Sequence, residues 1–441
     1  IKNTTGYSLN ALIDYQDPID MLAHLMVGSE GTLGFISEVT LDTVPEHPYR
    51  AVSLVLFRNM EQCCLAVTAL KKAPVAAVEL IDSRSLAAVA GKSAMPLSKS
   101  QVAELGIDAA ALLVETRSEF AEVLEKNIEQ LLAVLKPFQT ALPAKFSNDS
   151  AIIQELWAIR KGLFPSVGAV RKTGTTVIIE DVAFPIASLA AGVRDLQKLF
   201  NDYGYDEALI FGHALEGNLH FVFAQSFDTE QERERYRGFM DAVCYLVAVD
   251  YQGSLKAEHG TGRNMAPYVE LEWGKDAYLL MKQIKQVFDP QGILNPGVIL
   301  NDDPEVHLKN LKVLPAAHEL IDKCIECGFC EPVCPSRNLS LTPRQRIALY
   351  RDIVQKRRDG ESPSKLKKLQ DDFTYLGLDT CAATGLCEDR CPVGINTGEL
   401  VKVLREEKNA KWQSSANLIG RHFGGVTKIL RAGLKASDVG H

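Results

Sequence analysis

Strand-like runs of apolar residues alternate with segments of helical periodicity between residue 49 and about residue 300. The predicted strands cover residues 51–57, 75–80, 111–116 and 177–182, and the predicted helices cover residues 60–71, 120–135, 154–160 and 186–203. Because the two kinds of element do not alternate strictly, their order favours an α+β sheet with helices packed on one side. The turn-rich run 288–297 closes this region.

A polar break interrupts the apolar stretch 211–223, which predicts two strands joined by a tight turn. If Glu216 and Gly217 form the turn, His213 faces His220 across the strand pair, with Cβ atoms roughly 4.5–5.5 Å apart. Two imidazoles so placed can hold one divalent metal ion. The alternative for each is a histidine satisfied within the core.

A second polar stretch, residues 258–263, follows with two glycines. Glu258 is a candidate third metal ligand, and His259 is a candidate general base because its ordinary pKa lies near neutral pH. Neighbouring side chains of a straight strand point to opposite faces, so both can serve one site only if the glycines bend the chain. A capped loop with one ion pair is the alternative. Arg160, near the end of a predicted helix, is either a bidentate clamp for a substrate carboxylate or a surface arginine.

A glycine-rich turn, residues 28–34, lies between an apolar run (21–27) and a strand-like run (35–44). Three glycines in seven residues let the backbone approach a phosphate or a flat ring closely. The turn is not the dinucleotide-fold fingerprint, because no helical pattern follows it.

The overall composition narrows the class of protein. A length of 441 residues suggests two to four domains, and a net charge of −8 argues against a nucleic-acid-binding surface. No run of eighteen apolar residues is present, and we expect no signal peptide. The chain begins at Ile1 without Met, and we expect a piece of a longer polypeptide.

Seven of the ten cysteines fall between residues 324 and 391, which indicates cofactor ligation in a reducing compartment. The other three, Cys63, Cys64 and Cys244, lie in apolar surroundings and are interpreted as buried thiols. The first four of the seven have spacings of two, two and three residues and are followed by Pro335. This spacing wraps three thiolates around one iron–sulfur cluster and sends the fourth to another cluster.

A degenerate copy follows, in which Thr384 stands where the second cysteine would be. In the crossed scheme the first site takes Cys324, Cys327, Cys330 and Cys391, and the second takes Cys334, Cys381 and Cys387. Three thiolates suit a three-iron cluster, or a four-iron cluster with one ligand that is not a cysteine. The helical stretch 342–368 connects the two halves, and residues from Gly424 onward predict the start of a further element.

Several motifs resemble those of the FAD-linked oxidase family, which includes D-lactate and D-2-hydroxyglutarate dehydrogenases. They are GSEGTLG (28–34), GHALEGNLH (212–220), EHGTGR (258–263) and FDPQGILNPG (288–297). Residues 318–400 resemble the two-cluster ferredoxin domain of succinate dehydrogenase iron–sulfur subunits, where a residue other than cysteine leaves a three-iron cluster. The combination resembles the large fused D-lactate dehydrogenases of bacteria.

The resemblance implies a domain order and a set of functional residues. Residues 1–48 would be the C-terminal part of a PCMH-type FAD-binding domain, 49–300 an α+β cap domain with an antiparallel sheet, 318–410 an all-α two-cluster domain, and 411–441 the start of a further region. The implied FAD contacts are Gly28, Ser29, Gly31, Thr32 and Gly34, with Asn295 near the flavin. The implied ligands of a divalent metal (Zn, Mn or Fe) are His213, His220 and Glu258. His259 would be the base, and Arg160 would bind the substrate carboxylate.

Two departures from the family pattern bear on the substrate. Ile179 replaces a lysine of some members, and Val222 replaces a polar residue. Both changes favour a monocarboxylate such as D-lactate, oxidised to pyruvate, over D-2-hydroxyglutarate. Electrons would pass through the clusters to a quinone or a carrier protein, in the cytoplasm or at the inner face of the membrane, with any membrane contact through parts outside this chain. An iron–sulfur electron-transfer module without chemistry of its own is the alternative from another class.

Overall fold

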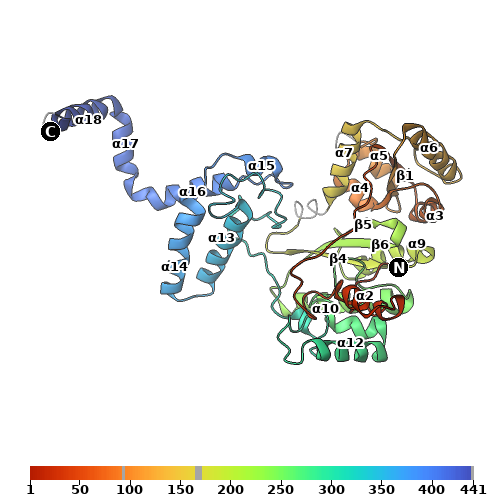
Figure 1. Ribbon diagram of the computed structural model, residues 1–441. Coiled ribbons are helices and arrows are strands. Elements are labelled where there is room, and N and C mark those ends of the chain that lie inside the picture. The colour runs from red at the N-terminus through yellow and green to blue at the C-terminus, as the bar shows by residue number, and fades with distance from the viewer. Residues whose placement is uncertain (92–94, 164–170, 439–441) are drawn as a thin grey trace. The chain divides into compact units, whose positions relative to one another are not determined.

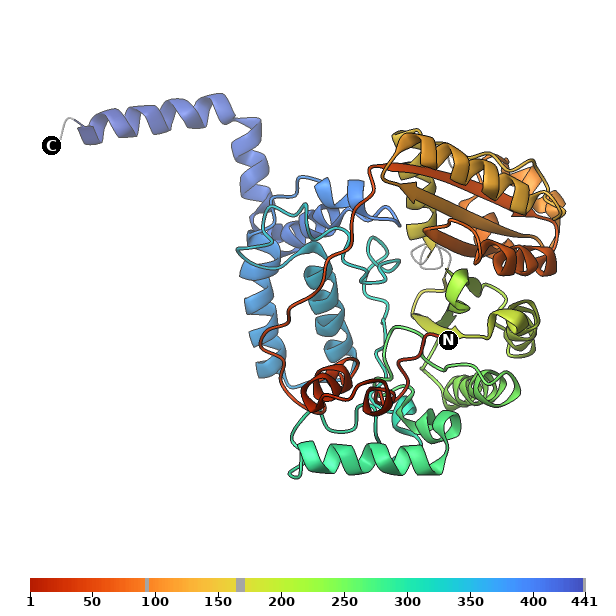
Figure 2. The ribbon, with the colours of Figure 1, turned by 45° about the vertical axis from the view of Figure 1, so that its right-hand side comes forward.

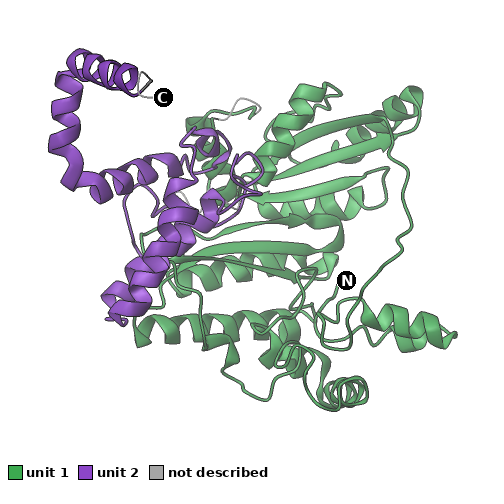
Figure 3. Cartoon of the chain, turned by 60° about the vertical axis from the view of Figure 1, so that its left-hand side comes forward, with its two compact units in different colours: residues 1–314 green, residues 315–441 purple. Residues whose placement is uncertain are grey.

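The computed structural model describes residues 1–91, 95–163 and 171–438 and divides the chain into two compact units. Unit 1 spans residues 1–314 and unit 2 spans residues 315–441 (Figure 3). None of the helices in the described residues is both long and apolar enough to cross a bilayer.

A six-stranded sheet organises unit 1 (Figure 1). Its order is β1-β3-β2-β5-β6-β4, and every neighbouring pair is antiparallel. The strands are β1 (Tyr49–Phe57), β2 (Ala77–Asp82), β3 (Ala110–Ser118), β4 (Thr176–Ala183), β5 (Leu209–His213) and β6 (Asn218–Gln225). The predicted antiparallel α+β architecture is therefore confirmed.

Helices cover both faces of this sheet, so the expectation of helices on one side is wrong. One core joins the sheet to α3 (Met60–Leu70), α6 (Ala121–Leu135), α9 (Leu189–Asp202) and α10 (Glu230–Tyr245). The other joins it to α4 (Ser83–Val89), α5 (Lys99–Leu105) and α7 (Ser150–Lys161). The cause lies in the strands, whose consecutive residues are both apolar: Leu56 is in the second core and its neighbour Phe57 is in the first.

The N-terminal segment packs against the last helices of unit 1. After α1 (Ala11–Asp14) and α2 (Pro18–Met26), the side chains of Leu25 and Leu33 share a core with Val269 of α11 (Val269–Trp273) and Met281 of α12 (Lys275–Phe288). Figure 2 shows this red segment beside α12. The strand-like run 35–44 forms no strand, because it has no pairing partner among the described residues.

The described residues of unit 2 form helices and loops. The helices are α13 (Pro343–Arg358), α14 (Pro363–Phe373), α15 (Leu386–Arg390), α16 (Thr397–Asn409), α17 (Gln413–Arg421) and α18 (Phe423–Asp438). The predicted helical stretch 342–368 is two helices, since Gly360 and Pro363 break it. Short turns complete the chain: 3₁₀ segments η1 (Ile186–Ser188), η2 (Ala214–Glu216), η4 (Ala266–Tyr268), η5 (Val306–Leu308) and η7 (Ala410–Trp412), and π segments η3 (Leu246–Asp250) and η6 (Thr374–Asp379).

Candidate functional site

The hairpin β5–β6 carries both candidate histidines, in a register different from the predicted one. Phe211, not His213, pairs with His220. The turn is longer than two residues, because η2 precedes Gly217, whose left-handed backbone (φ 68°) closes it. A shift of two residues keeps the side chains on the same face of the sheet. The two imidazole rings therefore remain neighbours, with centroids 5.4 Å apart.

Glu258 joins these two histidines from a distant loop. Its Oε1 atom lies 3.3 Å from Nε2 of His213 and 3.1 Å from Nε2 of His220. The candidate ligand atoms of the three residues all lie within 4.8 Å of one another. Burial lowers the pKa of His220 to about 4, which keeps that imidazole neutral and able to act as a ligand. The three groups thus come together as expected, and their role as metal ligands stays a prediction.

Glu79 of β2 holds His213 in place and was not anticipated from the sequence. It is the cross-strand partner of His213, and its Oε1 atom lies 2.6 Å from Nδ1 of that imidazole. Burial alone would raise the pKa of Glu79, but the hydrogen bond to His213 and the charge of Arg160 outweigh burial and lower it. The same hydrogen bond raises the pKa of His213. Glu79 therefore fixes Nδ1 as the protonated nitrogen of His213 and leaves Nε2 free for a ligand role.

Asp181 of β4 organises the loop that bears Glu258 and His259. Its buried carboxylate accepts hydrogen bonds from the backbone N–H groups of Ala257 (2.9 Å) and Glu258 (2.7 Å). Nδ1 of His259 lies 3.4 Å from the other oxygen of Asp181. The His259 ring stacks on the His220 ring, with centroids 4.9 Å apart.

The bend that this arrangement needs is present. Gly260 and Gly262 have φ angles of 80° and 57°, which lie in the region that favours glycine. Glu258 and His259 therefore both reach the face of the sheet that carries the two histidines, which neighbouring residues of a straight strand could not do.

Arg160, at the end of α7, belongs to the same cluster of side chains. Its Nε atom donates to Oε2 of Glu79 at 2.8 Å, and its guanidinium carbon lies 4.5 Å from the centre of the Phe211 ring. Its side chain is only 13% exposed, so it is not a solvated surface arginine. Its role as a carboxylate clamp stays a prediction.

The glycine-rich turn docks on the loop of Glu258. The carboxylate of Glu30 accepts hydrogen bonds from the backbone N–H groups of Thr261 (2.7 Å) and Gly262 (2.9 Å). Asn295 donates from Nδ2 to the backbone oxygen of Glu30 at 2.7 Å. Since His213 and His220 also contact Glu258, all four family motifs meet around this loop.

Within the turn, four of the five residues expected to contact FAD divide into two groups. Ser29 and Thr32 are buried, and the Thr32 hydroxyl bonds the Tyr7 hydroxyl at 2.7 Å, so these side chains hold the turn itself. Around Gly28 and Gly31 the space is open, since an added Cβ would meet nothing within 4 Å. The backbone at these glycines suits close approach by a flat or phosphate-bearing group. The FAD contacts stay predictions.

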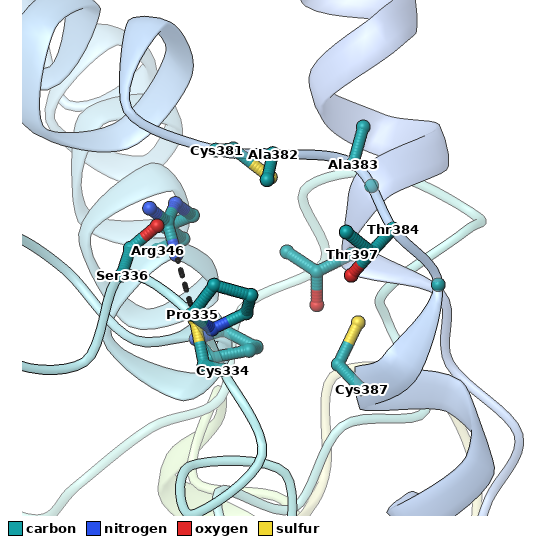
Figure 4. Close-up of a pocket in the computed structure, with 13 residues that line it drawn as sticks. Cys334, Pro335, Ser336, Arg346, Cys381, Ala382, Ala383, Thr384, Cys387 and Thr397 are labelled. Atoms are coloured by element: carbon teal, nitrogen blue, oxygen red, sulfur yellow. Dashed lines mark hydrogen bonds between the residues drawn. The ribbon is translucent and has the colours of Figure 1, made fainter.

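In unit 2 the cysteines fall into the two predicted groups. Burial and the nearby thiols of Cys324 and Cys391 raise the pKa of Cys330 to about 12, and Cys327 is a further neighbour. This grouping agrees with the first site of the crossed scheme. The second group, Cys334, Cys381 and Cys387, lines a pocket together with Thr384 and Thr397 (Figure 4). All seven thiols are free of disulfides, as cluster ligands must be, and their role as ligands of two clusters stays a prediction.

Comparison with known proteins identifies both units. A family model described as the C-terminal domain of FAD linked oxidases matches residues 46–299, and a model of the 4Fe-4S dicluster domain matches residues 320–395.

Three curated relatives show how similar the chain is to known proteins. Glycolate oxidase subunit GlcD of Bacillus subtilis is 29% identical over 289 residues, which cover 64% of this chain and 57% of that protein. D-lactate dehydrogenase of Anaerostipes hadrus is 30% identical over 308 residues, which cover 68% of this chain and 59% of that protein. D-2-hydroxyglutarate dehydrogenase of Pantoea ananatis is 25% identical over 453 positions, which cover 89% of this chain and 44% of that protein.

The chain thus spans about half the length of the curated relatives it matches. The oxidase model alone covers more than half of the 441 residues. These matches agree with the motifs that meet around Glu258 and with the grouped cysteines. They show that the chain belongs to the FAD-linked oxidase family and carries a 4Fe-4S dicluster domain C-terminal to the oxidase domain in sequence.

Proposed function

We propose that the protein oxidises a D-2-hydroxy acid, with D-lactate to pyruvate as the favoured reaction, and passes the electrons through its iron–sulfur clusters to a quinone or a carrier protein. The observation that carries this proposal is the convergence of His213, His220 and Glu258 beside His259 and Arg160. A non-catalytic electron carrier would not need this group of side chains.

We assign the following roles to the side chains of unit 1. The two imidazoles and the Glu258 carboxylate form a set of three ligands that suits a divalent ion such as zinc, manganese or iron. His259 takes the proton of the substrate hydroxyl and is oriented by Asp181. Arg160 holds the substrate carboxylate, while Glu79 keeps its guanidinium in place. When bound, a metal ion supplies a Lewis acid, FAD the hydride acceptor and the clusters one-electron carriers.

The strand surface next to the site favours a substrate with one carboxylate. Asp181 pairs with His220 across β4 and β6, and two residues farther along Ile179 pairs with Val222 on the same face. Val222 is buried, and Ile179 packs against the same apolar core. A second carboxylate placed there would be desolvated against these two apolar side chains. The rival substrate, D-2-hydroxyglutarate, is supported by the relative that spans 89% of the chain.

A substrate panel tests the proposal in the full-length protein. Flavin bleaching by D-lactate, glycolate, D-2-hydroxyglutarate and L-lactate is followed in the absence of an acceptor. We expect D-lactate to bleach fastest and His259→Ala to abolish bleaching, while the exposed His422→Ala serves as the matched control. Faster bleaching by D-2-hydroxyglutarate would select the rival substrate. Bleaching by no hydroxy acid, with iron in unit 2 and no metal bound by His213, would leave the electron carrier.

We also propose a cellular location for the reaction, and the free cysteines support it. Thiols at these positions persist as cluster ligands in a reducing compartment, so we place the protein in the cytoplasm. A quinone acceptor would bring it to the inner face of the membrane.

A further inference from the structure

A buried arginine lies against the second group of cysteines. Arg346, in α13, is 1% exposed. It donates from Nε to the backbone oxygen of Gly377 at 2.7 Å and from one terminal nitrogen to the Thr380 hydroxyl at 3.3 Å. Its other terminal nitrogen lies 3.7 Å from Sγ of Cys334, the contact drawn in Figure 4.

The charge of Arg346 has no carboxylate to balance it. Among the described residues no Asp or Glu oxygen lies within ion-pair distance of its guanidinium. The acidic residue beside its hydrogen-bond partner Thr380, Asp379, instead faces Lys408 at 3.5 Å. A buried cation without a partner costs several kcal/mol. The remaining source of negative charge is the pocket itself, where the thiolates of Cys334, Cys381 and Cys387 would carry it.

We propose that Arg346 raises the reduction potential of the cluster held by Cys334, Cys381 and Cys387 by placing an unbalanced positive charge and a hydrogen bond against the sulfur of Cys334. Reduction adds one electron to the cluster, breaks no bond and makes the pocket more negative. A neighbouring cation stabilises the reduced form more than the oxidised form. Hydrogen bonds to ligand sulfur act in the same direction.

The first group of cysteines provides the contrast. Arg351, also in α13 and 3% exposed, donates to the backbone oxygens of Ile321 and Cys324 but faces the Glu326 carboxylate at 3.4 Å. Its charge is therefore balanced, whereas that of Arg346 is not. The second group also has one thiolate fewer, since Thr384 replaces a cysteine. Both differences make the second cluster the better electron acceptor, so electrons would come to rest there before they leave the protein.

The test compares three variants of the complete protein, with clusters assembled anaerobically. Arg346→Gln removes the charge, and Arg346→Lys keeps it. Arg405→Gln is the matched control, because Arg405 donates to the backbone oxygens of Leu378 and Cys381 along the same segment without touching a sulfur. The readouts are iron content and a potentiometric titration of the second cluster by electron paramagnetic resonance.

We expect Arg346→Gln to shift the equilibrium toward the oxidised cluster at least tenfold, which is about 59 mV for one electron. Arg346→Lys should recover most of this shift, and Arg405→Gln should move the potential much less. If Arg346→Gln fails to assemble the second cluster while Arg346→Lys assembles it, the positive charge is needed as a counter-charge and the proposal stands. An unchanged potential in Arg346→Gln would overturn it. Equal shifts, or equal loss of the cluster, in both Arg346 variants would overturn it as well.

Discussion

Glu79→Gln tests whether the network behind His213 prepares a metal site. In the native chain each oxygen of Glu79 serves one partner: Oε1 lies 2.6 Å from Nδ1 of His213, and Oε2 accepts from Nε of Arg160 at 2.8 Å. Glutamine has one acceptor oxygen and an amide nitrogen that only donates. The variant can therefore satisfy one of the two N–H groups, and its amide nitrogen faces the other. Either His213 or Arg160 loses its fixed orientation.

The expected cost follows from these contacts. Removing the partner that orients a metal-ligating histidine weakens metal binding about 10- to 100-fold, or about 1.4–2.8 kcal/mol. Breaking a fully buried charge pair destabilises a protein by about 3–5 kcal/mol. Arg160 is 13% exposed and glutamine keeps one acceptor, so we expect a loss of about 2 kcal/mol in the free energy of unfolding.

Glu115→Gln is the matched control. Glu115 lies in the adjacent strand β3, is fully buried, and also serves an arginine and a ring N–H, those of Arg117 and Trp157. It touches neither histidine, so its replacement should cost stability and leave metal affinity unchanged. Titration of zinc or manganese into the metal-free protein, with urea unfolding in parallel, separates the two effects. Native metal affinity in Glu79→Gln, or an equal loss in Glu115→Gln, would refute the reasoning.

Three further changes probe other parts of the chain. Gly217→Ala would place a Cβ 1.9 Å from a backbone oxygen. It should therefore lower the free energy of unfolding in urea by about 2–4 kcal/mol and weaken metal binding. The control Gly106→Ala, where the space around the added Cβ is open, should lower it by about 1 kcal/mol. Thr384→Cys should complete the second thiolate set and raise the iron content by about one atom per chain if that cluster has three irons. The hydrogen bond from Lys285 lowers the pKa of Asp289, so its contribution to stability is present above its unfolded pKa of about 3.9 and is lost as pH falls through the lower folded pKa. The urea midpoints of the native protein and Asp289→Asn should therefore differ near pH 7 and converge below about pH 3.9.

His213 and His220 could be predicted as neighbours even though the predicted strand register was wrong. Side chains in a strand repeat with a period of two, so a register that is wrong by two residues still leaves His213 and His220 on one face. An error of one residue would have separated them. The glycines at 260 and 262 were equally informative, because only a bend could bring Glu258 and His259 to the same side.

Other features depended on contacts between strands distant in sequence. Glu79 and Asp181 lie in strands that are mostly apolar. From the sequence alone, a charged residue in such a strand cannot be distinguished from one that faces solvent. Only the placement of β2 beside β5 and of β4 beside β6 shows that both carboxylates are buried behind imidazoles. The prediction of a strand at residues 35–44 was wrong. The apolar residues of this run indicated a strand, but a strand also needs a pairing partner, which periodicity does not reveal.

The two units place opposite charges behind their candidate sites. In unit 1 the carboxylate of Glu79 lies behind His213, an imidazole that would hold a cation, and in unit 2 the guanidinium of Arg346 lies behind thiolates that would hold an anionic cluster. The charge of Glu79 is already balanced by Arg160 at 2.8 Å, whereas that of Arg346 has no carboxylate within ion-pair distance among the described residues and is offset only when its site is filled. A metal ion or a cluster that binds only the folded chain should stabilise the unit that contains its site. Since the charges are confined to separate units, a metal chelator should lower the unfolding temperature of unit 1, and oxidative loss of the clusters should lower that of unit 2.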